Sequence, residues 1–188
     1  MSAPEPTNPA GSGAVALRTL ASRTLASRTV EFEVVQVAAW RGGEAALRER
    51  LRAAGWVLPA FGQSWSVDGR LACCVRPERW LLIAERAGGP DGALAEACMA
   101  VVGDSGAVTD LSAARRAWRL HDPQARHKLA AGCRVDLDPA AFPPGQATVT
   151  LIAQVPVMIV SIDGGWLLMA PSSMGGHLDD WLRHVAFG

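Results

Sequence analysis

Residues 107–152 read AVTDLSAARRAWRLHDPQARHKLAAGCRVDLDPAAFPPGQATVTLI, and this stretch says most about the fold. It contains two strand signals, one short helix and a connector rich in Asp, Pro and Gly. Asp122 suits the N-cap of the helix and Pro123 its first position, where the missing N–H of proline has no intrahelical partner anyway. Gly132 is expected to end the helix in the left-handed conformation.

The connector after this helix is predicted to be a structured loop over residues 135–145. Apolar residues alternate with Asp136 and Asp138, as in a strand, but three prolines follow by residue 144. Proline lacks the backbone N–H that a central strand donates to its neighbour. The two aspartates are therefore expected in a loop.

The chain has no charged residue from position 139 to 162, a length that could cross a membrane. Four prolines, a glycine and two glutamines interrupt this segment, however, and a membrane span is not predicted. The β-branched runs at 148–152 and 157–160 indicate instead a hairpin largely covered by protein.

The pattern of the whole chain predicts an α+β protein with two similar halves, at about 30–112 and 113–188. The first half follows the order of a split βαββαβ (ferredoxin-like) unit, and the second repeats that order approximately. In the first half the predicted strands lie at 31–39, 65–75, 80–84 and 107–111, and the helices at 44–54, capped by Gly55, and 91–102. In the second half the predicted strands lie at 114–120, 148–152, 157–160 and 166–169.

A C-terminal helix is predicted from an apolar stripe, with Ser172 or Ser173 as its N-cap. The stripe consists of Met174, Leu178, Trp181, Leu182 and Val185.

Residues 1–29 are predicted to form a disordered or extended arm. Residues 1–16 are rich in Pro, Ala, Gly and Ser, a composition that cannot bury a core. The sequence LASRT then occurs twice in succession, at 20–24 and 25–29. Such an arm either docks on an acidic partner or is a solvated tail. A secretory signal is not predicted, because no basic residue precedes Arg18.

The composition is that of a globular protein with a small surplus of apolar residues. Of the 188 residues, 49% are hydrophobic and 19% charged, and seven are tryptophans. Such a surplus often covers a subunit interface, where tryptophan is enriched. The formal net charge is zero, so the long-range field that attracts nucleic acid is absent and nucleic-acid binding is not expected.

The sequence lacks the motifs of nucleotide and metal sites. Gly-x-Gly-x-x-Gly does not follow any predicted strand and Cys-x-x-Cys does not occur, so neither a dinucleotide fold nor a zinc site is predicted. No catalytic, cofactor-binding or metal-ligating residue is predicted in this chain. Four cysteines are expected to be packing residues, the first two on opposite faces of one strand: Cys73, Cys74, Cys98 and Cys133.

The histidines and one serine also lack catalytic contexts. His177 and His184 lie seven residues apart on the C-terminal helix, roughly 10 Å along its axis and too far to share a metal ion. His121 and His127 flank the short helix and are expected to be capping or surface residues. The sequence GDSG at 103–106 resembles the nucleophile loop of chymotrypsin-like proteases, but a turn between helix and strand is predicted there.

A basic cluster has two possible roles. It could bind an anion, or it could pair with acidic groups of a protein partner, and the partner role is preferred because an Arg-rich strand and helix rim suit salt bridges. The cluster comprises Arg115, Arg116, Arg119, Arg126 and Lys128.

Several motifs together resemble one known family. They are VRPERWLL at 75–82, VTDLS at 108–112, WRLHDPQAR at 118–126, GCRVDLDP at 132–139, FPPG at 142–145, PSSM at 171–174 and LDDWL at 178–182. This set resembles the gamma subunit of heterotetrameric sarcosine oxidase, which is related to the folate-binding aminomethyltransferases. The two predicted halves would then correspond to the N-terminal part of those aminomethyltransferases.

The resemblance implies a non-catalytic structural subunit of an oxidoreductase that acts on CH–NH donors with oxygen as acceptor. Such a complex oxidatively demethylates sarcosine to glycine, passes the one-carbon unit to tetrahydrofolate or releases formaldehyde, and forms hydrogen peroxide. It implies alpha, beta and delta subunits as partners, a cytoplasmic location, and FAD, FMN, NAD, tetrahydrofolate and zinc bound by those other subunits. The alternative is a stand-alone folate-binding aminomethyltransferase-like protein.

Asp136 and Asp138 are the carboxylates with the best claim to a ligand role. Folate-binding relatives use an acidic residue near the pterin, although no motif aligns either aspartate with it. Local hydrogen bonding in an Asx-turn explains both residues equally well.

Overall fold

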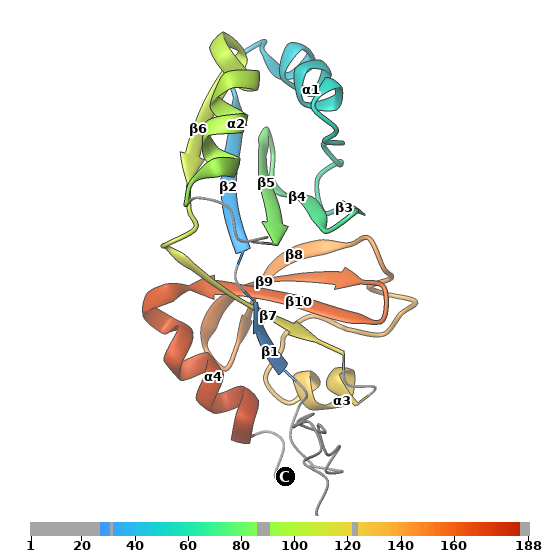
Figure 1. Ribbon diagram of the computed structural model, residues 1–188. Coiled ribbons are helices and arrows are strands. Elements are labelled where there is room, and N and C mark those ends of the chain that lie inside the picture. Colours follow the sequence, from blue (N-terminus) through green and yellow to red (C-terminus); the bar gives the residue numbers. More distant parts are fainter. Residues whose placement is uncertain (1–26, 31, 86–90, 122–123, 185–188) are drawn as a thin grey trace, which may run out of the picture.

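The computed structural model describes residues 27–30, 32–85, 91–121 and 124–184, which form two five-stranded antiparallel sheets (Figure 1). The first sheet runs in the spatial order β3 (Ser64–Val67), β4 (Arg70–Arg76), β5 (Arg79–Glu85), β2 (Phe32–Ala39) and β6 (Gly106–Asp110). The second sheet runs in the order β1 (Ser27–Val30), β7 (Arg115–Leu120), β10 (Gly165–Pro171), β9 (Val155–Ile162) and β8 (Ala147–Ile152).

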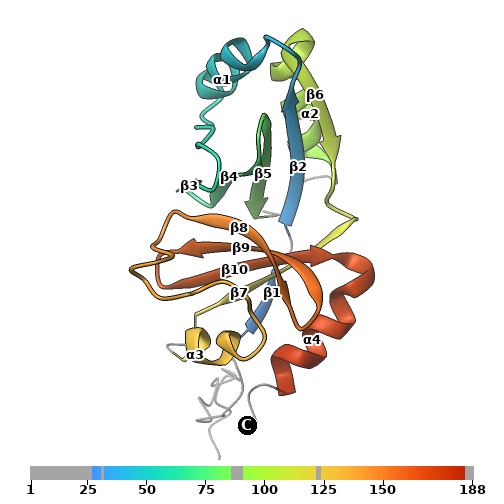
Figure 2. The ribbon, with the colours of Figure 1, turned by 180° about the vertical axis from the view of Figure 1, so that it is seen from behind.

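Each sheet has one face covered by two helices. The first sheet packs against α1 (Glu44–Ala53) and α2 (Ala93–Val102), through residues such as Leu47 and Cys98. The second sheet packs against α3 (Ala125–Ala130) and α4 (Gly175–His184), through residues that include Leu129 and Leu178 (Figure 2). Two short 3₁₀ helices precede β6 and α4: Gly103–Ser105 and Ser172–Met174.

The other faces of the two sheets pack against each other and form a third core. Side chains alternate along a strand, so Trp80 and Leu82 of β5 face the helices while Leu81 and Ile83 face the second sheet. The inter-sheet core comprises Phe32, Val34, Leu71, Cys73, Ile83, Ala117, Ala147, Met158, Val160, Leu167 and Met169. The molecule is therefore layered as helices, sheet, sheet, helices.

The two sheets have corresponding strand orders. In sheet position, β2 corresponds to β7, β5 to β10, β4 to β9 and β3 to β8. The remaining edge position is filled by β6 in the first sheet and by β1 in the second, where Ser27 pairs with Leu120. In the second half, no strand follows α4 among the described residues. The edge position of this sheet is filled by β1, which precedes the first half in the sequence.

The predicted α+β class is confirmed, with one strand divided. The strand predicted at 65–75 is a hairpin of β3 and β4, because Asp68 and Gly69 have φ values of 48° and 76°. Asp-Gly is the sequence typical of a two-residue hairpin turn that requires positive φ at both positions. The hairpin predicted downstream is confirmed as β8 and β9, which turn at Ala153 and Gln154.

Gly132 does not have the predicted left-handed conformation, whereas the predicted cap Gly55 has a φ of 83°. A Cβ atom at position 132 would lie 2.5 Å from Cζ2 of Trp181 on α4. The glycine therefore leaves room for the close approach of the indole ring and is not needed for the backbone angle. Residues 135–145 form turns and irregular loop, as predicted.

The prediction that Ser172 or Ser173 is the N-cap is wrong, because both lie in a 3₁₀ turn before α4. Ser172 begins this turn, and its hydroxyl donates to the carbonyl oxygen of Ala113 at 2.8 Å. It thereby connects the end of β10 to the start of β7. The helix itself begins three residues later, and Leu178 and Leu182 of its predicted stripe are buried.

Some predicted features lie outside the described residues. These are residues 1–26 of the arm, the predicted cap at Asp122 and Pro123, and Val185. Within the described residues, no helix has the length and apolar character needed to cross a membrane.

Gly165→Ala is expected to destabilise the chain by about 1–3 kcal/mol, because its methyl group would collide with the Leu120 carbonyl oxygen across the β7–β10 pairing. Gly176→Ala is the matched control. Position 176 is helical with open space around it, so alanine should stabilise the chain by about 0.5–1 kcal/mol. Chemical denaturation would measure the free energy of unfolding of both variants. Equal changes in the two variants would contradict the close approach of Gly165 to the Leu120 carbonyl oxygen.

Candidate functional site

Polar side chains at one end of the inter-sheet layer line a pocket of about 190 Å³. Its polar residues are Gln36, Arg76, Arg79 and Arg115, and its lining contains no acidic residue. We call it the arginine pocket. Its remaining lining consists of Val75, Trp80, Leu81, Val149, Pro156, Met158, Met169 and Pro171.

The first sheet supplies Arg76 and Arg79 on either side of a two-residue turn. They are direct cross-strand partners in the pairing of β4 with β5, and both are exposed. Glu78, within the turn, has a φ of 57°, and its carbonyl oxygen accepts from the backbone N–H of Ala39 at 3.1 Å. The turn is thereby fixed against β2. Like charges directly opposite each other in a sheet repel, so this pair does not stabilise the hairpin.

The second sheet supplies Arg115, the first residue of β7 and the cross-strand partner of Pro171. Its side chain is half-buried, and its Nε is a buried atom that has no hydrogen-bond partner in the protein. Among the described residues, Arg76, Arg79 and Arg115 make no ion pair with an acidic side chain. Three guanidinium groups without an acidic partner among the described residues therefore line one small pocket.

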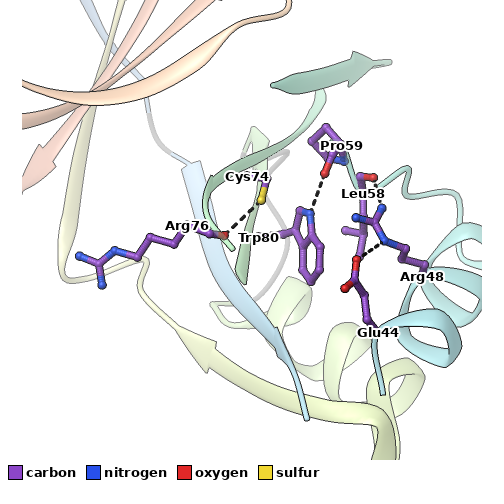
Figure 3. Close-up of polar contacts among 7 residues, drawn as sticks. All are labelled: Glu44, Arg48, Leu58, Pro59, Cys74, Arg76 and Trp80. Atoms are coloured by element: carbon purple, nitrogen blue, oxygen red, sulfur yellow. Dashed lines mark hydrogen bonds and ion pairs between the residues drawn. The ribbon is translucent and has the colours of Figure 1, made fainter. Parts of the chain in front are cut away.

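A polar cluster on the outer face of β5 fixes the strand that presents Arg79 (Figure 3). Trp80 Nε1 donates to the carbonyl oxygen of Pro59 at 2.9 Å, and the guanidinium carbon of Arg48 lies 4.9 Å from the Trp80 ring centroid. Arg48 also donates to the Leu58 carbonyl at 2.5 Å and pairs with Glu44 at 2.8 Å. Figure 3 shows the side chain of Arg76 pointing away from this cluster.

A second pocket, of about 400 Å³, lies at the opposite end of the inter-sheet layer. Its lining includes Arg119, His121, Ser161 and Asp163. The lining also includes Arg70, but here Arg119 is neutralised within the chain, since its Nη2 lies 2.8 Å from Oε1 of Glu85.

The predicted basic cluster does not form one anion site, because alternation along β7 divides it between two faces. Arg116 faces α4, where its Nη2 lies 2.5 Å from Asp179 Oδ2, and Trp118 Nε1 donates to Asp179 Oδ1 at 2.5 Å. Arg126 on α3 pairs with Asp138 at 2.8 Å. Of the five residues, only Arg115 lines the arginine pocket.

Asp136 and Asp138 are engaged in local backbone hydrogen bonds. The N–H of Asp138 donates to Asp136 Oδ1 at 2.9 Å, and the N–H of Ala140 donates to Asp138 Oδ1 at 3.0 Å. These are two successive Asx-turns, which shape the connector. Both carboxylates thus have structural partners within the chain.

The cysteines are packed as predicted. Cys74 faces the helices and Cys73 faces the second sheet, where its Sγ lies 3.4 Å from the sulfur of Met158. Burial raises the pKa of the Cys73 thiol to about 12 and that of Cys98 to about 11. Burial also raises the pKa of Cys133.

The histidines lie at the surface, and the GDSG segment forms a turn. His121, His127, His177 and His184 are exposed. Residues 103–106 form the predicted turn, in which the Ser105 hydroxyl donates to the Val102 carbonyl at 2.6 Å. Within the described part of the chain, no group of three His, Cys, Asp or Glu residues could hold a metal ion.

Sequence reasoning did not identify Gln36, Arg76 or Arg79 as site residues. The available signal was the motif Arg-Pro-Glu-Arg at 76–79, in which two arginines flank a turn. Their convergence with Arg115 depends on the packing of the two sheets.

Comparison with known sequences identifies close relatives, although no protein-family profile matches the chain. The sarcosine oxidase subunit gamma of Corynebacterium sp. (strain P-1) is 35% identical over 153 residues, which cover 79% of this chain and 71% of the relative. The subunit of the same name from Arthrobacter sp. is 30% identical, covering 91% and 79%. That from Corynebacterium sp. (strain U-96) is 32% identical, covering 96% and 83%.

Two solved structures have a similar fold. A chain of the heterotetrameric sarcosine oxidase from Corynebacterium sp. U-96 in complex with pyrrole 2-carboxylate matches with a TM-score of 0.75 and 28% identity, over 88% of this chain and 85% of that chain. The glycine cleavage system aminomethyltransferase T from Bartonella henselae matches with a TM-score of 0.60 and 18% identity, over 86% of this chain and 46% of that chain.

The fold is therefore aminomethyltransferase-like, with two antiparallel sheets packed face to face. All three sequence relatives within that class are sarcosine oxidase gamma subunits. The chain belongs to this family.

At pH 8 the thiols of Cys73 and Cys98 are expected not to react with Ellman's reagent in the folded chain, because the thiolate is the reactive form and their pKa values lie well above this pH. Both should react once the chain is unfolded in guanidinium chloride. Rapid labelling of Cys73 in the folded chain would contradict its placement between the sheets.

Proposed function

We propose that this chain acts as a non-catalytic structural subunit of a heterotetrameric sarcosine oxidase, assembled with alpha, beta and delta subunits in the cytoplasm. The observation that carries the proposal is the structural match to a chain of such a heterotetramer over most of both chains. The three sequence relatives, all gamma subunits of sarcosine oxidase, support it.

In the proposed complex, sarcosine is oxidatively demethylated to glycine. The one-carbon unit passes to tetrahydrofolate or leaves as formaldehyde, and oxygen is reduced to hydrogen peroxide. FAD, FMN, NAD, tetrahydrofolate and zinc belong to the other subunits. The sequence supports this division, because it has no glycine-rich dinucleotide motif and no Cys-x-x-Cys.

We also infer that the chain consists of two repeats of a split βαββαβ unit, each extended by one further strand, which is β3 in the first repeat and β8 in the second. The corresponding strand orders of the two sheets support this inference. In the second repeat β1 replaces the last strand, so residues 27–30 belong to the same folding unit as residues 113–188 rather than to a separate arm.

The proposal is tested by expressing the tagged chain alone and together with the alpha, beta and delta subunits of the same organism. Alone, the chain should be colourless, free of stoichiometric zinc, unable to bind folate, and marginally soluble or self-associating, because its apolar surplus is uncovered. Together, it should co-purify with a flavin-containing complex that forms hydrogen peroxide from sarcosine. A well-behaved monomer that fails to join this complex would count against the proposal, as would a flavin spectrum in the chain purified alone.

Asp136→Ala and Asp138→Ala should lower the yield of complex but leave turnover per assembled complex near the wild-type value, because both carboxylates order the connector. Asp138→Asn is the matched control. It keeps an oxygen acceptor for the Ala140 N–H while losing the charge that pairs with Arg126, so its yield should exceed that of Asp138→Ala. A large loss of turnover or of folate affinity in fully assembled, stable variants would place this subunit in the chemistry.

A further inference from the structure

We propose that the arginine pocket binds a carboxylate group carried on a short apolar stem. The pocket brings together cationic groups from both sheets, and its lining offers them no anion. Supply of this carboxylate by a partner subunit rests on the proposed function, whereas binding of a carboxylate in the pocket does not.

The first argument is charge. Arg76 and Arg79 face each other across the β4–β5 turn, and Arg115 approaches from β7, with no acidic partner for any of them among the described residues. A buried donor without an acceptor is costly, and the Nε of Arg115 is such a donor, as is the Nε of Arg119 in the second pocket. An anion in the pocket would remove both penalties, because it neutralises the repulsion and accepts from the guanidinium groups.

The second argument is shape. The guanidinium group is a planar fork that matches the two oxygens of a carboxylate. Besides the cationic groups, the pocket is lined by apolar side chains, including Met158, Met169 and the half-exposed Val149. Such a lining suits an alkyl stem and leaves the oxygens of a free phosphate without partners among these side chains. Gln36 can donate its amide N–H to the same carboxylate.

The third argument is size. Sites for drug-sized ligands usually measure about 300–1,000 Å³. A pocket of about 190 Å³ holds a carboxylate with a stem of a few carbons, and it is too small for a folate or a nucleotide. The same chemistry occurs in a free short-chain carboxylic acid and in a glutamate side chain or chain terminus of a partner subunit.

Binding is tested on the full chain by thermal unfolding, followed by tryptophan fluorescence at matched ionic strength. Butyrate at 10 mM should raise Tm, since a ligand that binds only the folded state stabilises it, while butyramide and phosphate should not. Arg115→Gln should weaken butyrate binding by tenfold or more, and the exposed helical variant Arg52→Gln should bind like wild type. Without ligand, Arg115→Gln should unfold at or slightly above the wild-type Tm, because it removes an unpaired donor.

The source of the carboxylate is tested by charge reversal in the coexpressed complex. If a partner subunit supplies it, Arg79→Glu should reduce the yield of complex by tenfold or more, while Arg52→Glu should not. If a free acid is the ligand, Arg79→Glu should assemble normally and still lose the response to butyrate. Both results support the carboxylate site and distinguish its source.

Equal Tm shifts with butyrate and butyramide would overturn the proposal, as would an unchanged butyrate shift in Arg115→Gln or a response to phosphate alone. Failure of the wild-type chain to join a flavoprotein complex would instead contradict the proposed function. The butyrate measurement on the free chain would remain valid in that case.

Discussion

Burial of apolar side chains between the two sheets is the interaction on which the rest of the structure depends. Within the described residues the helices span at most ten residues, and helices of that length are marginal without tertiary packing. Each pair of helices covers only one face of its sheet, so the other face must be covered by the second sheet. The two pockets lie where this apolar layer ends.

The sequence predicts most of this framework, because strand alternation and helix periodicity are local signals. The pattern around Trp80 and Leu82 identifies a strand, and Gly55 ends α1 as expected. The strand β1 lacks such a signal. It is four residues long, occupies an edge and pairs with residues 117–120, about ninety positions away in the chain. Its sequence reads as a repeated polar linker, and only the exposed edge of β7 makes it a strand.

Glycines and arginines show why the remaining details could not be predicted. Gly132 and Gly165 resemble turn residues in the sequence, but each lies at a close approach of a distant element, the Trp181 side chain in one case and the backbone of β7 in the other. The sequence predicts a single basic cluster because its members are near one another in the chain. Alternation along β7 instead sends Arg115 and Arg119 to the inter-sheet side and Arg116 toward α4.

Arg115 and Arg119 provide an internal comparison, since they lie at opposite ends of the same strand and face the same layer. The Nε of each is buried without a partner, but Arg119 pairs with Glu85 and lies over the ring of Phe32, so its charge is neutralised within the fold. Arg115 has no such acid among the described residues, and it lies near a like-charged pair from the other sheet. The folded chain would be at least as stable with a neutral side chain at position 115, or with an acidic side chain opposite Arg115. The cationic end of the layer is therefore better explained by an anion that comes from outside this chain.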